Sequence, residues 1–339
     1  MKKKYKKKLI ICFGTRPEYL KIKQLINNLN KNYFSIVYLR QHKDIKENFS
    51  YDFMVKIPEI KSSNRLNDII INVLKNFPRI KNYEYMLVQG DTTAALSAAI
   101  FAFNNKINLI HLEAGLRSFN LSSPYPEEAN RKLISTIAKI HLAPTNLSKK
   151  NLLNENIKKN IYVTGNTSLD NIVKYKNKCT YEKKILITLH RREKIFELEK
   201  WLSKIDQIAK VNTEYEFIYP VHPSPQINKI ASTFKNITKV EHLNHSDLLK
   251  ILCKSRFVIS DSGGIQEEAS FLNKKVIVCR DVTERPEGIK SGHLIMCDSY
   301  KKIDTIFNKV LNNYKISKAC PYGDGYSGLR ISKILKKLL

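Results

Sequence analysis

The sequence predicts an α/β protein with two doubly wound, parallel-sheet domains that face each other across a cleft. At 339 residues the chain is longer than one hydrophobic core usually supports, so two domains are expected. Short apolar runs typical of buried parallel strands alternate with stretches of helical periodicity, first over residues 9–164 and again over 185–279. Polar residues directly follow most of these runs, at the strand ends where open α/β sheets bind their ligands.

The stretch from Gln89 to Arg131 contains the clearest of these units. Apolar runs at 85–88 and 107–112 are predicted strands. The residues between them, 92–103, are rich in Ala, Leu and Ile and begin with threonines suited to a helix N-cap. They are predicted to form the crossover helix that a parallel pair of strands requires.

Three acidic side chains stand at the ends of these elements. Asp91 follows the first strand, Glu113 follows the second, and Glu127 begins a further predicted helix that runs through Arg131 to Ile137. Adjacent parallel strands end at the same edge of a sheet, so Asp91 and Glu113 are expected to lie close together. Three carboxylates that converge from three loops indicate proton-transfer chemistry rather than ordinary solvation.

An apolar run at 9–13, a predicted strand, is followed at once by Gly-Thr-Arg-Pro-Glu at 14–18. Pro17 suits the first turn of a helix, which puts Arg16 beside a helix N-terminus, a position typical of phosphate binding. A plain strand-to-helix turn with a solvated Arg16 explains the same residues equally well. The absence of a GxGxxG fingerprint argues against a dinucleotide-dependent oxidoreductase.

A polar, lysine-rich stretch at 174–183 is the predicted linker between the domains. The first domain is completed by predicted strands at 34–39, 140–143 and 161–164 and a predicted helix at 65–77. The second domain has predicted strands at 185–189, 215–219, 257–259 and 276–279. The polar residues that follow these last strands and that we consider for ligand binding are His190, Arg191, His222, Ser262, Gly263, Gly264 and Arg280.

The segment 262–268 opens a helix whose N-terminus has no bulky side chains. Its N–H groups and the helix dipole would hold a diphosphate, and Glu268 could accept both hydroxyls of a ribose. A Ser/Gly-capped helix with two surface glutamates explains this segment as well when it is taken alone. Together with the basic residues at neighbouring strand ends, an anion site is the better interpretation, and a nucleoside diphosphate fits it. The Gly-Lys-Ser/Thr signature of a P-loop is absent.

The composition is strongly basic, with 59 Lys and Arg against 31 Asp and Glu, a formal net charge of +28. Such a chain attracts polyanions. However, apart from residues 2–8 the lysines are spread evenly, without the aromatic-interleaved pattern of nucleic-acid binding, so no nucleic-acid partner is expected. Loose association with an anionic membrane surface is the most that the charge supports.

No apolar run is long enough for a membrane span or a signal peptide, and a cytoplasmic protein is expected. The six cysteines include no CxxC pair, and four of them lie within or beside apolar runs, as buried free thiols do. This spacing argues against a disulfide framework or a zinc site.

Several short motifs follow one another in an order that resembles a known family. They are GTRPE at 14–18, QGDT at 89–92, HLEAGLRS at 111–118, PEEANR at 126–131, TGNT at 164–167, HRRE at 190–193, PVHP at 220–223, DSGGIQEE at 261–268, TERPE at 283–287 and PYGDG at 321–325. Over nearly its whole length the chain is similar to the non-hydrolysing UDP-N-acetylglucosamine 2-epimerases. Leu189 and Leu248 are departures, because the family usually has Gly and often an aromatic residue at these two places.

The resemblance implies a fold of GT-B type with two Rossmann-like domains. It places an N-terminal sugar and catalytic domain at 1–168, a UDP-binding domain at 169–321, and a C-terminal helix at 322–339 that packs back on the first domain. It implies interconversion of UDP-GlcNAc and UDP-ManNAc by anti elimination of UDP to a 2-acetamidoglucal and re-addition of UDP. No cofactor and no metal are expected. A homodimer is expected.

The resemblance also assigns roles to residues. Asp91, Glu113 and Glu127 are the candidate proton-handling acids, and Arg131 orients them. His190 and Arg16 would assist the diphosphate. The candidates for holding the UDP-sugar are Arg191, His222, Ser262, Gly263, Gly264, Glu268 and Arg280. Family members commonly need UDP-GlcNAc as an activator, for which the loop residues Gln41, His42 and Lys43 are candidates.

Other functions stay open at this stage. A 2-epimerase for a modified UDP-sugar, such as a diacetamido-uronate or a deoxy-sugar, would use the same carboxylates. A hydrolysing epimerase usually has an Asp-Tyr pair where this chain has Pro17-Glu18. A GT-B glycosyltransferase would leave the acids of PEEANR without a role. A basic module that binds RNA or membranes explains the charge but none of the residues at strand ends.

Overall fold

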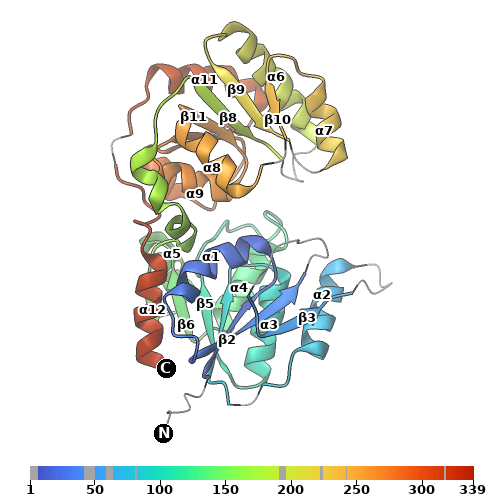
Figure 1. The fold of residues 1–339 in the computed structure, drawn as a ribbon, viewed down its shortest axis with the longest axis vertical. Helices are drawn as coiled ribbons and strands as arrows, with labels where there is room; N and C mark the ends of the chain where they lie inside the picture. The colour runs from blue at the N-terminus through green and yellow to red at the C-terminus, as the bar shows by residue number, and fades with distance from the viewer. Residues whose placement is uncertain are drawn as a thin grey trace. The chain divides into compact units, whose positions relative to one another are not determined.

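The computed structural model describes residues 7–41, 50–58, 64–80, 82–190, 196–221, 224–241, 243–316 and 318–339. The chain forms two compact units: Met1–Asn171 with Gly325–Leu339, and Ile172–Asp324. Each unit contains one sheet, all of whose strand pairs are parallel, with helices flanking the strands (Figure 1). The predicted α/β class with two parallel-sheet domains is confirmed.

The first unit has a seven-stranded sheet in the order β3-β2-β1-β4-β5-β6-β7. Its strands are β1 Leu9–Phe13, β2 Phe34–Arg40, β3 Phe53–Lys56, β4 Tyr85–Gln89, β5 Asn108–Leu112, β6 Ile140–Ala143 and β7 Ile161–Val163. Its helices are α1 Arg16–Asn27, α2 Arg65–Asn76, α3 Thr93–Asn104, α4 Glu127–Ile137, α5 Asn146–Asn154, α12 Ser327–Leu338 and the 3-10 helix η1 Thr167–Asn171. The strand order reverses at β1, which pairs with both β2 and β4, and such a switch point is where doubly wound sheets bind ligands.

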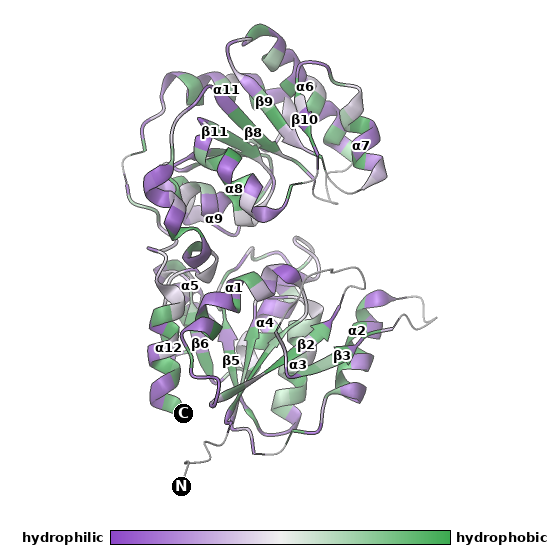
Figure 2. Ribbon diagram, viewed as in Figure 1, coloured by the Kyte–Doolittle hydropathy of each residue, from purple (hydrophilic) through white to green (hydrophobic). Residues whose placement is uncertain are grey.

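Strand β1 shows why the central strands read as continuous apolar runs. Ile10 and Cys12 belong to the hydrophobic core on one face of the sheet, whereas Leu9, Ile11 and Phe13 belong to the core on the other face. A strand that is buried on both faces needs apolar residues at every position. In Figure 2 the strands of both units are accordingly mostly green, and purple residues lie on the outer faces of the helices.

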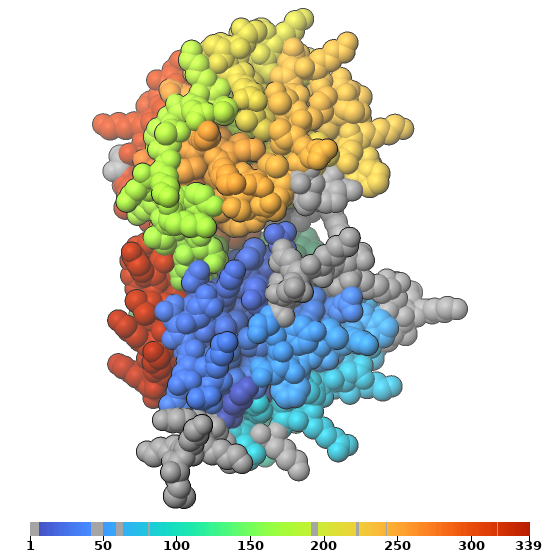
Figure 3. Space-filling view, viewed as in Figure 1, coloured from blue at the N-terminus to red at the C-terminus, as the bar shows by residue number. Residues whose placement is uncertain are grey.

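The C-terminal helix α12 packs on the first unit. Ile331 and Leu335 of this helix join the core formed with α1. The Asp170 carboxylate accepts hydrogen bonds from the backbone N–H groups of Ser327, at 3.0 Å, and Gly328, at 2.5 Å, so it fixes the start of the helix. The space-filling view shows the red C-terminal residues lying against the blue N-terminal ones (Figure 3).

The second unit has a six-stranded sheet in the order β10-β9-β8-β11-β12-β13, which reverses at β8. Its strands are β8 Lys184–Thr188, β9 Glu216–Pro220, β10 Thr238–Val240, β11 Phe257–Ser260, β12 Lys275–Val278 and β13 Leu294–Met296. Its helices are α6 Leu198–Val211, α7 Pro225–Ser232, α8 His245–Lys254, α9 Gly263–Phe271, α10 Pro286–Lys290, α11 Ile303–Asn312 and the 3-10 helices η2 Val173–Lys178 and η4 Tyr300–Lys302.

The cysteines include one disulfide, between Cys179, just after η2, and Cys253 of α8. The remaining four cysteines are not part of a disulfide. The cysteine spacing argued against disulfides, and for this pair that expectation is wrong. The two residues are 74 positions apart, and only the packing of the residues after η2 against α8 brings them together. No helix in the described part of the chain is long and apolar enough to cross a bilayer.

Candidate active site

At the switch point of the first sheet, one buried carboxylate links the loops that follow two neighbouring strands. Glu18, near the start of α1, accepts hydrogen bonds from the backbone N–H groups of Gly14 and Thr15, at 2.9 and 2.6 Å. Its other oxygen accepts one from the Thr92 hydroxyl at 2.8 Å, and Thr92 is the N-cap of α3. Burial raises the pKa of Glu18, although the bonds from Thr15 and Thr92 act in the opposite direction. Glu18 therefore joins the loops after β1 and β4.

Glu113, the first residue after β5, is held by side chains from two other elements. Its carboxylate lies 2.6 and 2.8 Å from the ammonium group of Lys21 in α1 and also accepts a hydrogen bond from the amide of Gln89 in β4. Its backbone adopts the left-handed conformation, with φ at +70°, which is uncommon for a residue other than glycine. Such strain is concentrated at functional sites. The carboxylate is thus fixed and nearly buried at the strand edge.

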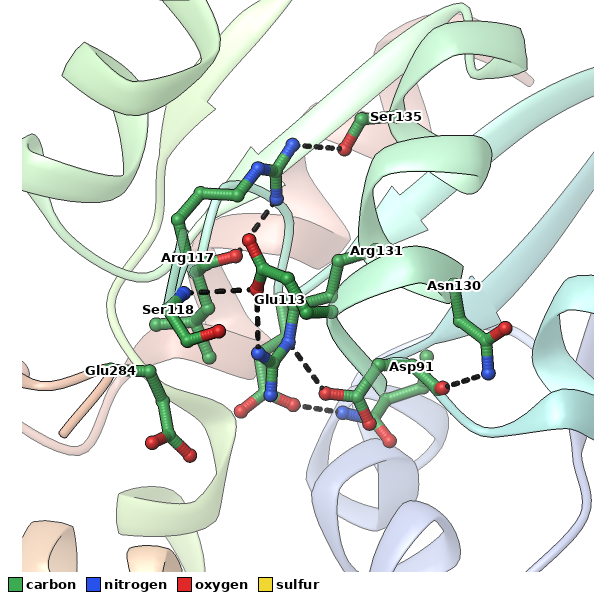
Figure 4. A network of polar contacts seen from close by, with 12 residues as sticks. Asp91, Glu113, Arg117, Ser118, Asn130, Arg131, Ser135 and Glu284 are labelled. Atoms are coloured by element: carbon green, nitrogen blue, oxygen red, sulfur yellow. Dashed lines mark hydrogen bonds and ion pairs between the residues drawn. The ribbon is translucent and has the colours of Figure 1, made fainter. Parts of the chain in front are cut away.

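Asp91 follows the sharp turn at Gly90, whose φ is +72°. Its carboxylate is only partly buried and accepts a hydrogen bond from Arg131 of α4 at 2.8 Å. Its backbone carbonyl accepts another from the amide of Asn130, also at 2.8 Å. Figure 4 shows Asp91 between these two side chains. Helix α4, which starts at the predicted acid Glu127, therefore also holds Asp91 in place through these two side chains.

The two acids at the start of α4 have different surroundings. Glu128 is fully buried, accepts hydrogen bonds from the backbone N–H groups of Ser118 and Phe119, and lies 3.1 Å from Arg131. It therefore fixes the loop that follows Glu113. Glu127 is partly exposed and is the first residue of the helix. Arg131 thus contacts both Asp91 and Glu128, and its role in orienting the three predicted acids stays a prediction.

At the switch point of the second sheet, His190 and Asp261 follow the neighbouring strands β8 and β11. The Asp261 carboxylate accepts a hydrogen bond from the backbone N–H of His190 at 2.9 Å, and the His190 side chain is exposed. Ser262 is the N-cap of α9, and its side chain makes no capping hydrogen bond within the described residues. The first N–H groups of α9 are therefore available to an anion.

The two glycines at the start of α9 are not equivalent. A Cβ atom at Gly263 would lie only 2.6 Å from the guanidinium of Arg285, whereas a Cβ at Gly264 would meet nothing within 4 Å. Arg285 is buried and bonded to Glu267 at 2.5 Å and to Glu284 at 2.6 Å. The guanidinium of Arg285 thus packs against the first residue of α9, and the carboxylates of Glu267 and Glu284 offset its positive charge.

Two further predicted ligands have protein partners. Glu268 lies 2.8 Å from the imidazole of His245, the first residue of α8. Arg280, two residues after β12, is buried and lies 2.9 Å from Glu284. Both side chains are in the unit that contains the start of α9.

Two of the remaining predicted residues, Arg16 and Gln41, lie near the end of β1. Arg16 is partly buried at the first position of α1. The backbone of Gln41 bonds to Gly14 at 3.3 Å, beside the switch point, and to Arg65 at 2.8 Å. The predicted residues His42, Lys43, Arg191 and His222 lie outside the described residues.

Sequence reasoning missed Lys21, Gln89, His245 and Arg285, the side chains that hold the predicted ones. A signal existed for Lys21, since it falls one helical turn and a half after Arg16 on a helix that starts at the switch point. Gln89 follows the predicted strand at 85–88 and directly precedes Gly90, so its position also indicated the site. His245 and Arg285 approach from other elements, and no local pattern indicates that.

The comparisons with known proteins agree with one another. The family model described as UDP-N-acetylglucosamine 2-epimerase matches residues 27–336. A Salmonella borreze protein named UDP-N-acetylglucosamine 2-epimerase is 36% identical, over 96% of this chain and 97% of its own. A Campylobacter jejuni protein of the same name is 34% identical, over 98% of both chains.

Two solved structures extend this similarity to the fold. The UDP-GlcNAc 2-epimerase from Neisseria meningitidis bound to UDP-GlcNAc is 32% identical with a TM-score of 0.86, over 97% of this chain and 100% of its own. The Methanocaldococcus jannaschii enzyme in complex with UDP-GlcNAc and UDP is 30% identical with a TM-score of 0.81, over 97% and 99%. The chain belongs to the UDP-N-acetylglucosamine 2-epimerase family.

Proposed function

We propose that the protein interconverts UDP-GlcNAc and UDP-ManNAc. The observation that carries this proposal is the pairing of carboxylates with fixed partners at the switch point of the first sheet: Glu113 with Lys21 and Gln89, and Asp91 with Arg131. Acids held in this way can remove or deliver a proton at one carbon of a bound sugar. Relatives at 30–36% identity that carry the name of this activity, and two whose structures contain UDP-GlcNAc, support the same substrate.

The proposed reaction has two steps. A carboxylate removes the proton on C2, the bond between C1 and the diphosphate oxygen breaks, and a double bond forms between C1 and C2. This gives UDP and 2-acetamidoglucal. In the second step the diphosphate oxygen attacks C1 again, and an acid delivers a proton to the opposite face of C2. Asp91, Glu113 and Glu127 are the proposed proton-handling groups, and each of the three could serve as the base at C2.

The second unit is proposed to hold UDP. The N–H groups at the start of α9, beginning with Gly263 and Gly264, would bind the diphosphate, since the positive end of the helix dipole stabilises anions. Glu268 would accept the ribose hydroxyls, and Arg280, Arg191 and His222 would add contacts to the UDP-sugar. His190 and Arg16 would stabilise the charge that develops on the diphosphate as the C1–O bond breaks.

The proposal extends to assembly and control. A homodimer is supported by apolar side chains that stay exposed on three helices packed side by side, Ile71 of α2, Phe103 of α3 and Leu133 of α4. Light scattering of the purified protein would measure its mass and so test the dimer.

We also propose a cytoplasmic location, and we propose that UDP-GlcNAc activates the enzyme by binding near Gln41. The test of activation is a progress curve from pure UDP-ManNAc, measured with and without a trace of UDP-GlcNAc.

The test of the proposed function is the conversion of a panel of UDP-sugars, followed by NMR of the anomeric and C2 protons. UDP-GlcNAc should approach a stable mixture with UDP-ManNAc and no loss of UDP-sugar. Free ManNAc with stoichiometric UDP would indicate a hydrolysing epimerase. Turnover of a diacetamido-uronate or deoxy-sugar nucleotide without turnover of UDP-GlcNAc would contradict the proposed substrate but keep the reaction.

A further inference from the structure

The two acid-bearing strand ends of the first unit hold each other through buried side chains. From β4, the amide of Gln89 donates a hydrogen bond to the carboxylate of Glu113, which follows β5. From β5, the imidazole Nε2 of His111 lies 2.8 Å from the carbonyl of Gly90, which directly precedes Asp91. Each strand therefore supplies one side chain to the end of the other. The backbone adds a third bond, from the N–H of Gly90 to the carbonyl of Leu112 at 3.0 Å.

The hydrogen-bond partner of His111 fixes the state of its ring. A carbonyl oxygen only accepts, so Nε2 must carry the proton and donate it. The side chain is completely buried, and burial lowers its pKa to about 3, so the ring is neutral at any pH at which an enzyme of this kind is assayed. Its Nδ1 is buried and has no hydrogen-bond partner among the described residues.

This arrangement is costly for a residue that only fills the core. A buried polar nitrogen without a partner costs free energy, and a leucine of similar size would avoid that cost. The hydrogen bond to Gly90 is what an apolar residue could not make. It acts on the turn that aims Asp91, where Gly90 already adopts a φ of +72°.

Resting on the proposed function, we infer that His111 and Gln89 are positioning residues of the epimerisation, which together set the placement of Asp91 relative to Glu113. His111 touches no reacting atom in this account, and neither does it exchange a proton. It acts through the Gly90 carbonyl, and Gln89 acts through the Glu113 carboxylate. The expected signature is a loss in turnover without a loss in substrate binding, because misplacing a reacting group by about 1 Å can lower a rate about a hundredfold.

The neighbouring His141 supplies a matched control. It is the register partner of His111 on β6, it is buried, and burial lowers its pKa to about 4. Its hydrogen bond is with the backbone of Ala138, at the end of α4 rather than at an acid-bearing turn. Replacing either histidine with leucine removes one buried ring and one hydrogen bond from the same sheet, but only one of the two changes affects the Gly90 turn.

The experiment compares His111→Leu, His111→Gln and His141→Leu with the wild type, in the conversion of UDP-GlcNAc and in thermal unfolding. Glutamine carries its N–H donor the same number of bonds from Cβ as the Nε2 of histidine, so it can restore the bond to Gly90. We expect His111→Leu to lower kcat about tenfold to a hundredfold with KM changed by less than about twofold. His111→Gln should recover most of kcat, and His141→Leu should keep it despite a similar loss in Tm. Gln89→Leu, which removes the reciprocal bond, should reproduce the kcat loss and remains informative if His111→Leu does not fold.

Three results would overturn the inference. They are wild-type kcat in folded His111→Leu and Gln89→Leu, an equal kcat loss in His141→Leu, or a His111→Gln variant that folds but is no better than His111→Leu. An inactive wild type would instead contradict the proposed function itself. The activity of the wild type and of His141→Leu therefore separates the failure of the function from the failure of the inference.

Discussion

The two sheets of this protein have similar switch points with opposite electrostatic character. At the edge of the first sheet, the loops after β4 and β5 present Asp91 and Glu113, each held by a cation. At the edge of the second sheet, the loop after β11 leads into the start of α9, where backbone N–H groups and the positive end of the helix dipole are presented. We therefore propose that the same topology serves once for proton transfer and once for holding an anion.

The charged side chains next to the two switch points are also paired differently. In the first unit, cationic side chains form ion pairs with the acids. Lys21 pairs with Glu113, and Arg131 pairs with Asp91 and Glu128. In the second unit, Arg285 is bonded to Glu267 and Glu284 beneath the start of α9. The carboxylates offset the guanidinium charge there, so the helix N-terminus itself supplies the positive potential. The comparison predicts that changes in the first unit affect catalysis and changes in the second affect nucleotide binding or local stability.

The largest expected effect concerns the acids of the first unit. Asp91→Asn, Glu113→Gln and Glu127→Gln should each lower kcat by about 10²–10⁴-fold, the usual contribution of an acid or base. The affinity for UDP, measured by calorimetry, should be almost unchanged. Glu84→Gln is the control, because Glu84 precedes the opposite end of β4 and is half-exposed. Normal turnover in Glu113→Gln would show that this carboxylate only supports the strand end.

The second largest effect is expected in the second unit alone. The Cys179–Cys253 bond closes a loop between residues 74 positions apart, and a disulfide of this span stabilises by about 4 kcal/mol in the chain-entropy account. Reduction, or Cys179→Ser with Cys253→Ser, should lower the unfolding temperature of this unit. Calorimetric scans with and without reductant measure this change, and Cys320→Ser, at a free cysteine of the same unit, is the control. Identical scans would show that the bond does not form in solution.

A smaller effect separates the two glycines of α9. Gly263→Ala forces Arg285 to move, because the new Cβ would lie 2.6 Å from its guanidinium, and overpacking of this kind costs about 1–3 kcal/mol. Gly264→Ala meets no atom within 4 Å and should leave the unfolding free energy almost unchanged. Denaturant titrations of both variants give the comparison. Equal stability of the two would contradict the supporting role of Arg285.

The most gradual effect is the dependence of stability on pH, because it is spread over several pH units. Burial lowers the pKa of His111 to about 3 and that of His141 to about 4 in the first unit, and that of His293 to about 4 in the second. Below pH 6.5 the unfolded chain binds protons that the folded rings do not, so stability should fall as the pH drops from 6.5 towards 4. Denaturant titrations across this range should show a steeper fall for the first unit. His111→Gln should flatten that fall, and an unchanged slope would mean that the ring titrates normally.

The predictability of the fold followed the degree of burial. Strands that are covered on both faces, such as β1 and β6, were predicted with their observed bounds. The three strands that were missed, β3, β10 and β13, all lie at sheet edges. Thr238 and Lys239 of β10 are exposed, so this strand lacks the continuous apolar run of a central strand.

The candidate site divides in a similar way. Asp91, Glu113 and Ser262 could be found because each lies within three residues of the end of an apolar run, and that position depends only on local sequence. His245 and Arg285 could not, because their role depends on which helix packs beside which strand end. The disulfide was missed for the same reason, since two distant cysteines meet only after the second unit folds.

The most direct test of the central claim is the isotope content at C2 after the reaction is run in D₂O. If carboxylates of the first unit remove and return the C2 proton, UDP-ManNAc formed from UDP-GlcNAc should carry deuterium at C2, and recovered UDP-GlcNAc should gain it with time. Mass spectrometry and the loss of the C2 proton signal in NMR measure both quantities. UDP-ManNAc that retains the original proton at C2 would contradict the account, because no carboxylate would then have exchanged it.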